Sequence, residues 1–412
     1  MLLLGLCSCH DEPGMFNYFP KEYFQKGIFD KYNAYESYEG QFKAFWEGMD
    51  CNYPIWDYEE KFGLNWDAVY AKYLPKFQEL DQRKNTVTNK EVDSLWKEIV
   101  SPLHDGHYNL GIHHLLTDNT WSQIIPAEIE NSKRKDFKTT SPTFESIRKT
   151  DNAEWGKVLS VWRDHFYIRF KGNICYFRVG SKFIWKCLDE NSDSYNNEYS
   201  KELRETWQEW IKEIKEFHDN NTLGGIIIDV RNLDGGANKD YQYIIGLFQP
   251  LDEKHPQYHS TGYLRYKNGP RRFDYAPLQD DQLPQTITEH IDVEEPIVVL
   301  ANCQSKSTAE HICLGAKQMS NARVIGKKTW GAFSPILELK GSMIGQIGLP
   351  NDKDNPLHVY MPGAAFVTKD GEIIEGKGVE PDIEVELDED LLKLYNRDSQ
   401  LERALQYIRT GE

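Results

Sequence analysis

The sequence predicts an α/β protein in which a largely parallel, helix-covered sheet follows a helical N-terminal region. Two continuous apolar runs, within residues 223–236 and 295–302, are typical of strands that are buried on both faces. Each run is followed by a helical pattern, around residues 241–248 and from residue 308, and residues 322–331 supply a third strand. Because strands that alternate with helices along a chain pair in parallel, this order predicts a parallel sheet.

The N-terminal region carries apolar and aromatic residues at helical spacing. Two stripes repeat every three or four residues, namely Tyr38, Phe42, Phe45 and Met49, and then Trp66, Val69, Tyr70, Tyr73 and Phe77. A third stripe predicts an amphipathic helix before the first apolar strand, with Leu203, Trp207, Trp210, Ile211, Ile214 and Phe217 on one face. We interpret these stripes as core residues and not as ligand sites.

The composition is that of a folded, acidic protein. Of its 412 residues, 39% are hydrophobic and 13% are aromatic, and the length favours two or three domains. The formal net charge of -17 argues against a nucleic-acid partner, which would require a basic face. The seven cysteines form no CxxC pair and have no histidine at zinc-finger spacing, so we expect no metal, and no motif implies an organic cofactor.

The opening residues, MLLLGLCSCHDEPG, resemble the end of a bacterial lipoprotein signal. Leu6 lies three residues before Cys9, Ser8 directly precedes it, and the apolar stretch is too short to cross a bilayer. We therefore expect lipidation at Cys9 and a membrane association through the lipid anchor only. The basic segment of such signals is missing, and an apolar N-terminus of no consequence is the alternative.

Two loops leave the carboxyl ends of the predicted strands, where chemistry gathers in α/β sheets. Residues 231–236, RNLDGG, end in two glycines whose backbone can present N–H groups to an oxyanion. Residues 302–307, NCQSKS, place Ser305 and Ser307 at a helix N-terminus, where unpaired N–H groups also favour an anion. Each serine could merely cap the helix, and one of them could instead be a nucleophile.

These segments resemble the tail-specific, or C-terminal processing, serine peptidases, whose core has a crotonase-like sheet. The family's Asp-x-Arg-x-Asn-x-x-Gly-Gly turn is matched by Asp229, Arg231, Asn232, Gly235 and Gly236. In the family the nucleophile lies three residues before a glutamate, and Glu310 marks Ser307 by this rule. The resemblance implies that Ser307 attacks and Ser305 shapes the turn. It also implies an oxyanion hole in which the N–H of Thr308 pairs with one from Gly235 or Gly236.

Two further segments add to the resemblance. Residues 373–385, IIEGKGVEPDIEV, match the Glu-Gly-x-Gly-Val-x-Pro-Asp signature of the family. Residues 103–110, LHDGHYNL, resemble the Asp-x-His segment of its tricorn-core branch. Because the four motifs occur in the family's order, we expect an α/β, crotonase-like protease core with a helical N-terminal domain.

The chain departs from the family at the group that activates the serine. Many members use a lysine in a TFGKG-like segment, but residues 329–333 read TWGAF, so that Ala332 occupies the lysine's place. An unassisted hydroxyl is a weak nucleophile near neutral pH. Lys327 and Lys328 lie earlier in the segment, and we interpret them as surface or strand-end residues, with a lysine base as the alternative.

The tricorn-like branch uses a histidine, and the resemblance implies that His107 is the general base. There a glutamate holds a hydroxyl beside the histidine; Glu375 is the candidate for the glutamate, but Gly106 precedes His107 and the hydroxyl is absent. His107 could then be oriented by Glu375 directly, by Asp105 or by a water. A structural histidine cluster is the alternative, since His104, His113 and His114 flank His107.

We therefore expect a serine peptidase of the bacterial cell envelope that cleaves peptides or unfolded protein tails through an acyl-enzyme at Ser307. The second hypothesis is an inactive family member that binds an apolar ligand or a peptide, which the missing lysine and the many Trp and Tyr residues favour. Acyl-CoA chemistry would rest on the fold alone. The sequence does not predict the oligomeric state.

The motifs also predict how the chain is organised. Residues 1–20 form a lipoprotein signal and leader, and residues 21–115 form the helical domain that ends in the DGH segment. Residues 116–165 are an insertion or linker that is short for a complete PDZ module, residues 166–390 form the peptidase core, and residues 391–412 form a C-terminal helix.

Overall fold

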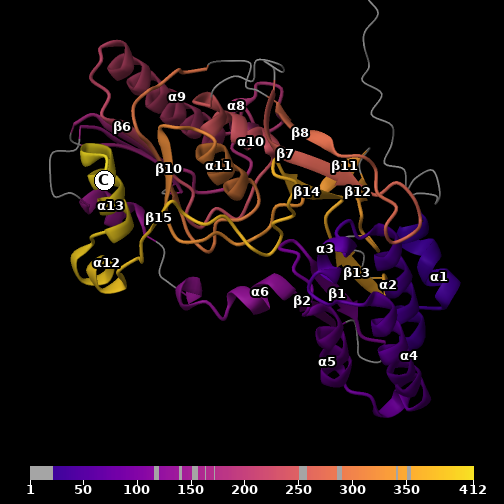
Figure 1. Ribbon diagram of the computed structural model, residues 1–412. Coiled ribbons are helices and arrows are strands. Elements are labelled where there is room, and N and C mark those ends of the chain that lie inside the picture. Colours follow the sequence, from indigo (N-terminus) through magenta and orange to yellow (C-terminus); the bar gives the residue numbers. More distant parts are fainter. Residues whose placement is uncertain are drawn as a thin grey trace, which may run out of the picture. The chain divides into compact units, whose positions relative to one another are not determined.

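The computed structural model describes residues 22–115, 120–138, 142–150, 156–162, 164–170, 172–249, 258–284, 290–339, 342–349 and 354–412. The chain forms two compact units, each of which is described by itself (Figure 1). The first unit comprises Met1–Ala127, Tyr263–Gln279 and Ser334–Val367, and the second comprises Glu128–Gly262, Asp280–Phe333 and Thr368–Glu412. The predicted leader and Cys9 lie outside the described residues.

The first unit is built on aromatic helices beside a small antiparallel sheet. Its helices are α1 (Ile28–Tyr32), α2 (Tyr38–Asn52), α3 (Trp56–Glu60), α4 (Trp66–Gln82) and α5 (Asn89–Val100), preceded by a π-helical turn (Tyr23–Gly27) and joined by a 3₁₀ turn (Lys84–Thr86). The sheet has the order β13-β1-β2, from Leu357–Tyr360, Asn109–His113 and Trp121–Ile124, and β11 (Leu337–Leu339) pairs with β12 (Ser342–Ile344).

The predicted helical stripes form the core of this unit. Phe42 of α2 stacks on Phe77 of α4 with ring centroids 4.8 Å apart, and Trp96 of α5 lies 4.9 Å from both Phe77 and Phe45. All four rings are buried. Aromatic pairs in these geometries stabilise a core beyond the area that they bury. The interpretation of the stripes as core residues is confirmed.

The second unit contains a seven-stranded sheet of order β15-β10-β9-β6-β5-β4-β3. Its strands are β3 (Val158–Val161), β4 (His165–Phe170), β5 (Ile174–Arg178), β6 (Gly225–Asp229), β9 (Ile297–Ala301), β10 (Ala322–Gly326) and β15 (Ile383–Glu384). The strands from β15 to β5 run parallel, whereas β4 and β3 extend the edge in antiparallel pairing. A separate sheet has the order β14-β7-β8, from Ala364–Thr368, Tyr258–Tyr266 and Gln279–Pro284.

Helices cover both faces of the seven-stranded sheet. α9 (Glu198–Asp219), α11 (Thr308–Lys317) and α13 (Ser399–Thr410) contact its strands, and α7 (Phe144–Lys149) adds residues to the core. The unit also contains α8 (Trp185–Leu188), α10 (Asn238–Tyr243), α12 (Glu389–Tyr395) and 3₁₀ turns at Lys135–Lys138 and Ile245–Leu247. Helix α6 (Pro126–Asn131) spans the boundary between the two units in the sequence. Tyr176 and its neighbours on one face form a cluster with Leu401 and Leu405 of α13. Phe177 points to the other face and stacks on Trp210 of α9 at 4.8 Å.

The parallel arrangement predicted from the alternating pattern is confirmed, and its three strands are β6, β9 and β10. The division of the chain differs from a simple succession, because two later segments, Tyr263–Gln279 and Ser334–Val367, belong to the first unit. The predicted insertion at 116–165 contributes β3 to the seven-stranded sheet. Among the helices that the structure describes, none has the length and apolarity to cross a membrane.

A buried charge network lies where β6 ends. The Arg231 guanidinium donates to Asp229 Oδ1 and Oδ2 at 3.0 and 2.6 Å, and it also contacts Asp398 at 2.8 and 3.0 Å and Gln400 at 3.0 Å. Arg178 donates to Asp229 at 3.2 Å. Each of these charges would be costly to bury alone, but each faces an opposite charge here. The network therefore joins the start of the glycine turn to α13.

This network predicts a component of acid sensitivity. Burial alone would raise the pKa of Asp229, but Arg231 and Arg178 outweigh burial and lower the pKa to about 2. A lowered pKa stabilises the fold above the unfolded-state pKa near 4, and that contribution is lost between about pH 4 and pH 2. We expect urea unfolding to show a loss of about 2 kcal/mol over this window that Asp229→Asn does not show. Equal pH slopes for the two proteins would contradict the assignment.

Candidate active site

Three loops leave the same edge of the second unit's sheet, after the parallel strands β5, β6 and β9. The loops after β6 and β9 are bonded to each other. The backbone N–H of Asn232 donates to Asn302 Oδ1 at 3.0 Å, and Asn302 Nδ2 donates to Asn232 Oδ1 at 2.7 Å. Lys306 N–H also donates to the Leu233 carbonyl at 2.9 Å. The two segments singled out in the sequence therefore form one structure.

Ser305 is a structural residue of this edge. Its side chain is fully buried, its hydroxyl donates to the Val230 carbonyl at 2.9 Å, and it accepts the Asn302 N–H at 3.0 Å. These bonds hold the start of the loop after β9 against the end of β6. The structure thus gives Ser305 the turn-shaping role that was expected.

Ser307 occupies the position before α11 without using its side chain as a cap. The Ser307 hydroxyl makes no cap hydrogen bond. Instead, the backbone N–H of Ser307 donates to the Glu310 side chain, at Oε2, at 3.0 Å. Its φ of 54° and ψ of -118° lie in a region that L-residues rarely adopt. Such backbone strain persists only where surroundings enforce it, and it concentrates at functional sites. The capping alternative is therefore not what the structure shows for Ser307.

The glycine turn lies directly against Ser307. A Cβ built on Gly235, whose φ is 115°, would lie 3.1 Å from Ser307 Cβ and 3.5 Å from Ser307 Oγ. A side chain at this position would therefore press on the serine. Thr308 is the first residue of α11, where backbone N–H groups have no acceptor within the helix. Gly235 and Thr308 thus flank Ser307, and the oxyanion hole formed by Gly235, Gly236 and Thr308 stays a prediction.

Glu310 holds the strained segment in place. Its buried carboxylate accepts from the N–H groups of Ser307, Gly331 and Ala332 at 3.0, 2.7 and 2.7 Å, and from the Thr329 hydroxyl at 2.6 Å. Burial raises the pKa of Glu310 to about 7, although these four donors favour the ionised form. In the sequence analysis, Glu310 served only to locate Ser307. Because Glu310 lies three residues after Ser307, a capping box could also have been predicted, in which the glutamate accepts the backbone N–H of Ser307.

The TWGAF segment carries no lysine at the family position, and its neighbours are engaged elsewhere. Ala332 is buried and donates its N–H to Glu310. Lys327 pairs with Glu384 and Glu386 at 2.6 and 2.5 Å, and Lys328 pairs with Glu380 at 3.2 Å. The interpretation of Lys327 and Lys328 as strand-end residues agrees with these pairs.

Glu375 lies beneath the same segment. Its carboxylate is 1% exposed and accepts the Phe333 N–H with both oxygens at 3.2 Å. Gly376 N–H donates to the Gly331 carbonyl at 2.9 Å, so the EGKG motif and the TWGAF segment are joined. The two motifs are thus brought together within the second unit, next to the carboxylate that supports Ser307.

His107 belongs to the first unit, immediately before β1, so its pairing with Ser307 and Glu375 stays a prediction. Within that unit, Asp105 Oδ1 accepts the His107 N–H at 2.8 Å and shapes the turn. The flanking histidines have structural partners. His104 bonds to Glu59 at 2.8 Å, His113 stacks on Trp121 at 5.3 Å, and His114 bonds to Ser122 at 2.8 Å.

Part of the chain is similar to a known protein family. Residues 193–385, which contain the glycine turn, Ser307 and Glu375, match the family model described as Peptidase family S41. This match covers a little under half of the chain, and over that segment the protein is similar to the S41 peptidases. A stretch of 163 residues of this chain is 26% identical to the carboxy-terminal processing protease CtpA of Bacillus subtilis, a match that covers 40% of this chain and 29% of that protein. The chain thus spans less than a third of the length of this curated relative.

Solved structures share the architecture of most of this chain. A protein of Parabacteroides merdae assigned as a peptidase has a TM-score of 0.62 at 20% identity, over 92% of this chain and 98% of that chain. Mature CPAF, solved with lactacystin, has a TM-score of 0.57 at 11% identity, over 92% of this chain and all of that chain. At these identities the likeness concerns the fold. The α/β, crotonase-like core with a helical N-terminal region is confirmed.

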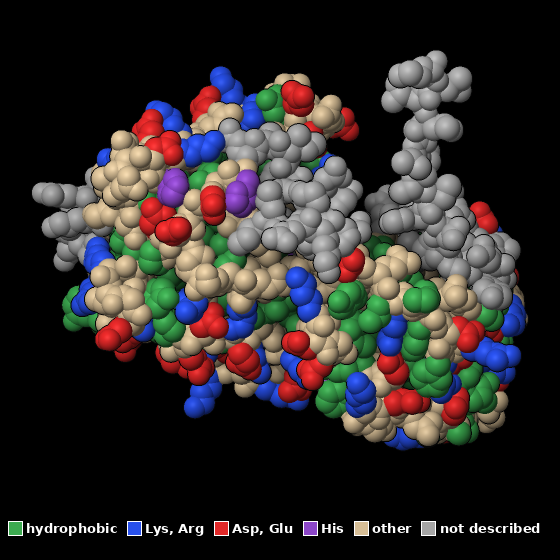
Figure 2. Space-filling view, turned by 45° about the horizontal axis from the view of Figure 1, so that its top comes forward, with side chains coloured by type: hydrophobic (Ala, Val, Ile, Leu, Met, Phe, Trp, Pro, Cys, Tyr) green, Lys and Arg blue, Asp and Glu red, His purple; other side chains and the backbone are tan. Residues whose placement is uncertain are grey.

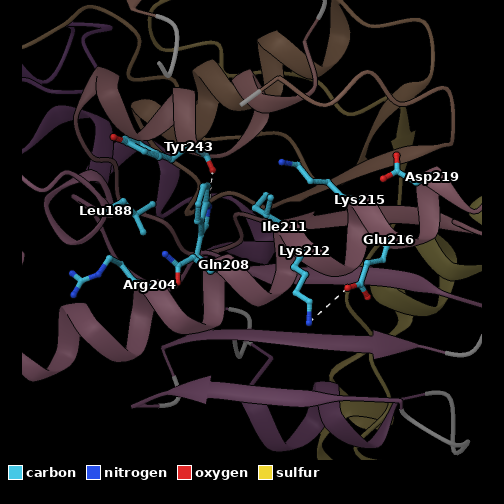
Figure 3. A pocket seen from close by; sticks show the side chains of 10 residues that line it. Leu188, Arg204, Gln208, Ile211, Lys212, Lys215, Glu216, Asp219 and Tyr243 are labelled. Carbon is cyan, nitrogen blue, oxygen red and sulfur yellow. Dashed lines mark hydrogen bonds and ion pairs between the residues drawn. The ribbon is translucent and has the colours of Figure 1, made fainter. Parts of the chain in front are cut away.

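A groove of about 500 Å³ lies along α9 (Figure 3). It lies between α9 and the α8 and α10 segments, and Trp207 donates its indole N–H to the Tyr243 carbonyl at 3.0 Å. None of its lining residues belongs to the serine loop or the glycine turn.

On the face shown in Figure 2, acidic and basic side chains of the described residues are interspersed.

Proposed function

We propose that the protein is a serine peptidase that hydrolyses peptide bonds of peptides or protein tails through an acyl-enzyme at Ser307. The observation that carries this proposal is Ser307 itself. It has a strained backbone at the N-terminus of α11, its hydroxyl makes no cap hydrogen bond, and Gly235 lies against it. The S41 match and the CtpA relative support the same reaction class.

In the proposed reaction, Ser307 Oγ attacks the substrate carbonyl carbon while its proton passes to the His107 imidazole. The carbonyl electron pair moves onto oxygen, and N–H groups of Thr308 and the glycine turn stabilise the oxyanion. Collapse of this intermediate breaks the C–N bond, and the leaving amine takes the proton from the imidazolium. Water then attacks the acyl-enzyme by the same steps and releases the acid. Glu375 or Asp105 would orient His107.

Labelling with a fluorophosphonate probe tests this proposal. We expect the purified wild type to form a covalent adduct, and we expect Ser307→Ala and His107→Ala to lose it. Ser305→Ala is the matched control on the same loop and should keep the adduct, because Ser305 only bonds to backbone groups. Absence of wild-type labelling between about pH 6 and pH 9, where an imidazole base becomes neutral, would overturn the peptidase proposal.

The second candidate is a binding protein on the same scaffold. Ala332, in the place of the family lysine, is the observation that favours it. We propose it only as the function that remains if Ser307 is unreactive. It would be supported if the wild type does not react with the probe and if the wild type and Ser307→Ala bind a peptide with equal affinity.

We also propose that the protein is a lipid-anchored member of the bacterial cell envelope. The sequence before Cys9 supports this proposal, since Leu6 and Ser8 stand where a lipoprotein signal has them. Incorporation of a labelled fatty acid in cells, lost on Cys9→Ala, is the measurement that tests it. Equal labelling of both proteins would contradict lipidation at Cys9.

A further inference from the structure

A buried carboxylate, that of Asp240, bonds to the predicted oxyanion turn. Asp240 of α10 is 3% exposed and lies four residues beyond Gly236. It received no role from the sequence motifs. Burial raises its pKa to about 6, while three backbone N–H groups favour its ionised form. A buried carboxylate that is not part of an ion pair needs such donors, and their positions show what it holds.

The three donors come from two different loops. Asp240 Oδ2 accepts the N–H of Ala237 at 2.9 Å and the N–H of Phe183 at 3.0 Å, and Oδ1 accepts the N–H of Trp185 at 2.8 Å. Ala237 directly follows the two glycines, whereas Phe183 lies in the loop after β5 and Trp185 begins α8 at the end of that loop. One carboxylate therefore fastens the glycine turn to the neighbouring loop at the same sheet edge.

Gly236 makes this fastening sterically possible. A Cβ on Gly236 would lie 2.1 Å from Asp240 Oδ2 and 3.6 Å from the Phe183 nitrogen. A side chain there would displace the carboxylate, because real Cβ atoms do not approach other atoms so closely. The second glycine is thus required by Asp240, just as the first glycine, Gly235, is required by Ser307.

We propose that Asp240 is a positioning residue: its carboxylate sets the glycine turn so that the turn's N–H groups point to the oxyanion beside Ser307. The proposal rests on the proposed function for its effect on rate. Asp240 touches neither the serine nor a reacting atom and acts only through the turn. Preorganised donors stabilise a transition state only when their direction is fixed beforehand.

The same contacts give the loop after β5 a place in the site. Lys182 pairs with Asp234 of the glycine turn at 3.6 Å, which adds a second link between the two loops. Phe183 has a φ of 64° and a ring that is 38% exposed. This exposed residue lies in the loop that Asp240 fastens to the glycine turn. We expect an Asp240 variant to release this loop together with the turn.

The test combines amide exchange with kinetics. Asp240→Asn keeps the size of the side chain but presents an NH₂ group to N–H donors. We expect faster deuterium exchange at residues 235–237 and a fall in kcat of about 100-fold with KM changed by less than about threefold. The matched control is Glu213→Gln, a buried carboxylate of α9 in the same unit that bonds to Tyr167 and Arg169. It should leave kcat, KM and exchange at 235–237 unchanged.

Gly236→Ala perturbs the same contact from the other side, so a folding defect in one variant does not end the test. We expect it to lower kcat similarly, and we expect the double variant to be no worse than the more impaired single variant, because both break one contact. An Asp240→Asn protein of lowered stability but wild-type kcat would overturn the proposal, as would unchanged exchange. A wild type without peptidase activity would overturn the proposed function instead, and the exchange data would still decide whether Asp240 holds the turn.

Discussion

Replacement of Arg231 by methionine is expected to lower the free energy of unfolding by about 3–5 kcal/mol, which is the range for removing one partner of a buried ion network. Asp229 and Asp398 are fully buried and both contact this guanidinium, as does Gln400, while Arg178 is a second cation beside Asp229 only. Without it, two carboxylates would remain in the interior with insufficient compensation. Urea unfolding near pH 7, analysed by linear extrapolation, measures the loss.

Arg397→Met is the matched control for this prediction. Arg397 pairs with Glu402 of α13 at 2.7 Å, but its side chain is 51% exposed. Exposed pairs of this kind contribute only about 0–1 kcal/mol. A similar loss of stability for both variants would show that the burial of Arg231 has no special energetic weight. Partial recovery in the combined Arg231→Met, Asp229→Asn variant would localise the effect to the unpaired carboxylate.

Replacement of Glu310 by alanine is expected to lower kcat by at least about 100-fold while the protein remains folded. Glu310 accepts the N–H of Ser307 and joins α11 to the segment of Thr329 and Ala332. Loss of these bonds would let Ser307 relax from its strained backbone, and a misplacement of about 1 Å is enough for such an effect. Steady-state kinetics on a peptide substrate, together with circular dichroism, measures both parts.

Thr329→Val provides the graded control for Glu310. It removes a hydroxyl that donates to the Glu310 carboxylate at 2.6 Å and leaves the bond to Ser307 in place. We expect a smaller loss of kcat than in Glu310→Ala. If Glu310→Ala kept kcat within about threefold of the wild type, the carboxylate would serve stability alone and the strain at Ser307 would be unrelated to catalysis.

Periodic patterns explain why much of the fold could be predicted. The apolar runs that became β6 and β9 are fully buried, and the stripe that became α9 places Leu203, Trp210 and Ile214 in the core. Burial on both faces and burial along one stripe leave distinct periods in a sequence. The parallel order of these strands follows from the helices between them.

Long-range pairing explains what could not be predicted. β1 pairs with β13 from the far part of the chain, with Ile112 opposite Leu357, and no local pattern specifies that partner. The same holds for the assignment of Tyr263–Gln279 and Ser334–Val367 to the first unit. Short antiparallel strands such as β3 also lack a strong period, so the 116–165 segment was predicted to be only an insertion or linker.

The candidate site also has a part that could be predicted from the sequence and a part that could not. The family resemblance implied that the glycine turn lies beside Ser307, and the structure brings Gly235 against Ser307. The supporting roles of the Glu310 and Asp240 carboxylates were not predicted. They follow from the burial of the two side chains and from the backbone N–H groups of Ser307 and Ala237 that donate to them. His107 as the base stays a prediction that the labelling experiment decides.

The link between Arg231 and α13 has a consequence for the order of folding. Arg231 leads into the glycine turn, yet two of its partners, Asp398 and Gln400, are synthesised more than a hundred residues later. During folding, the turn therefore lacks its final electrostatic support until this late segment has docked. Asp398 also caps α13 by accepting the N–H groups of Gln400 and Leu401. We expect Ser307 to become reactive only after that helix forms.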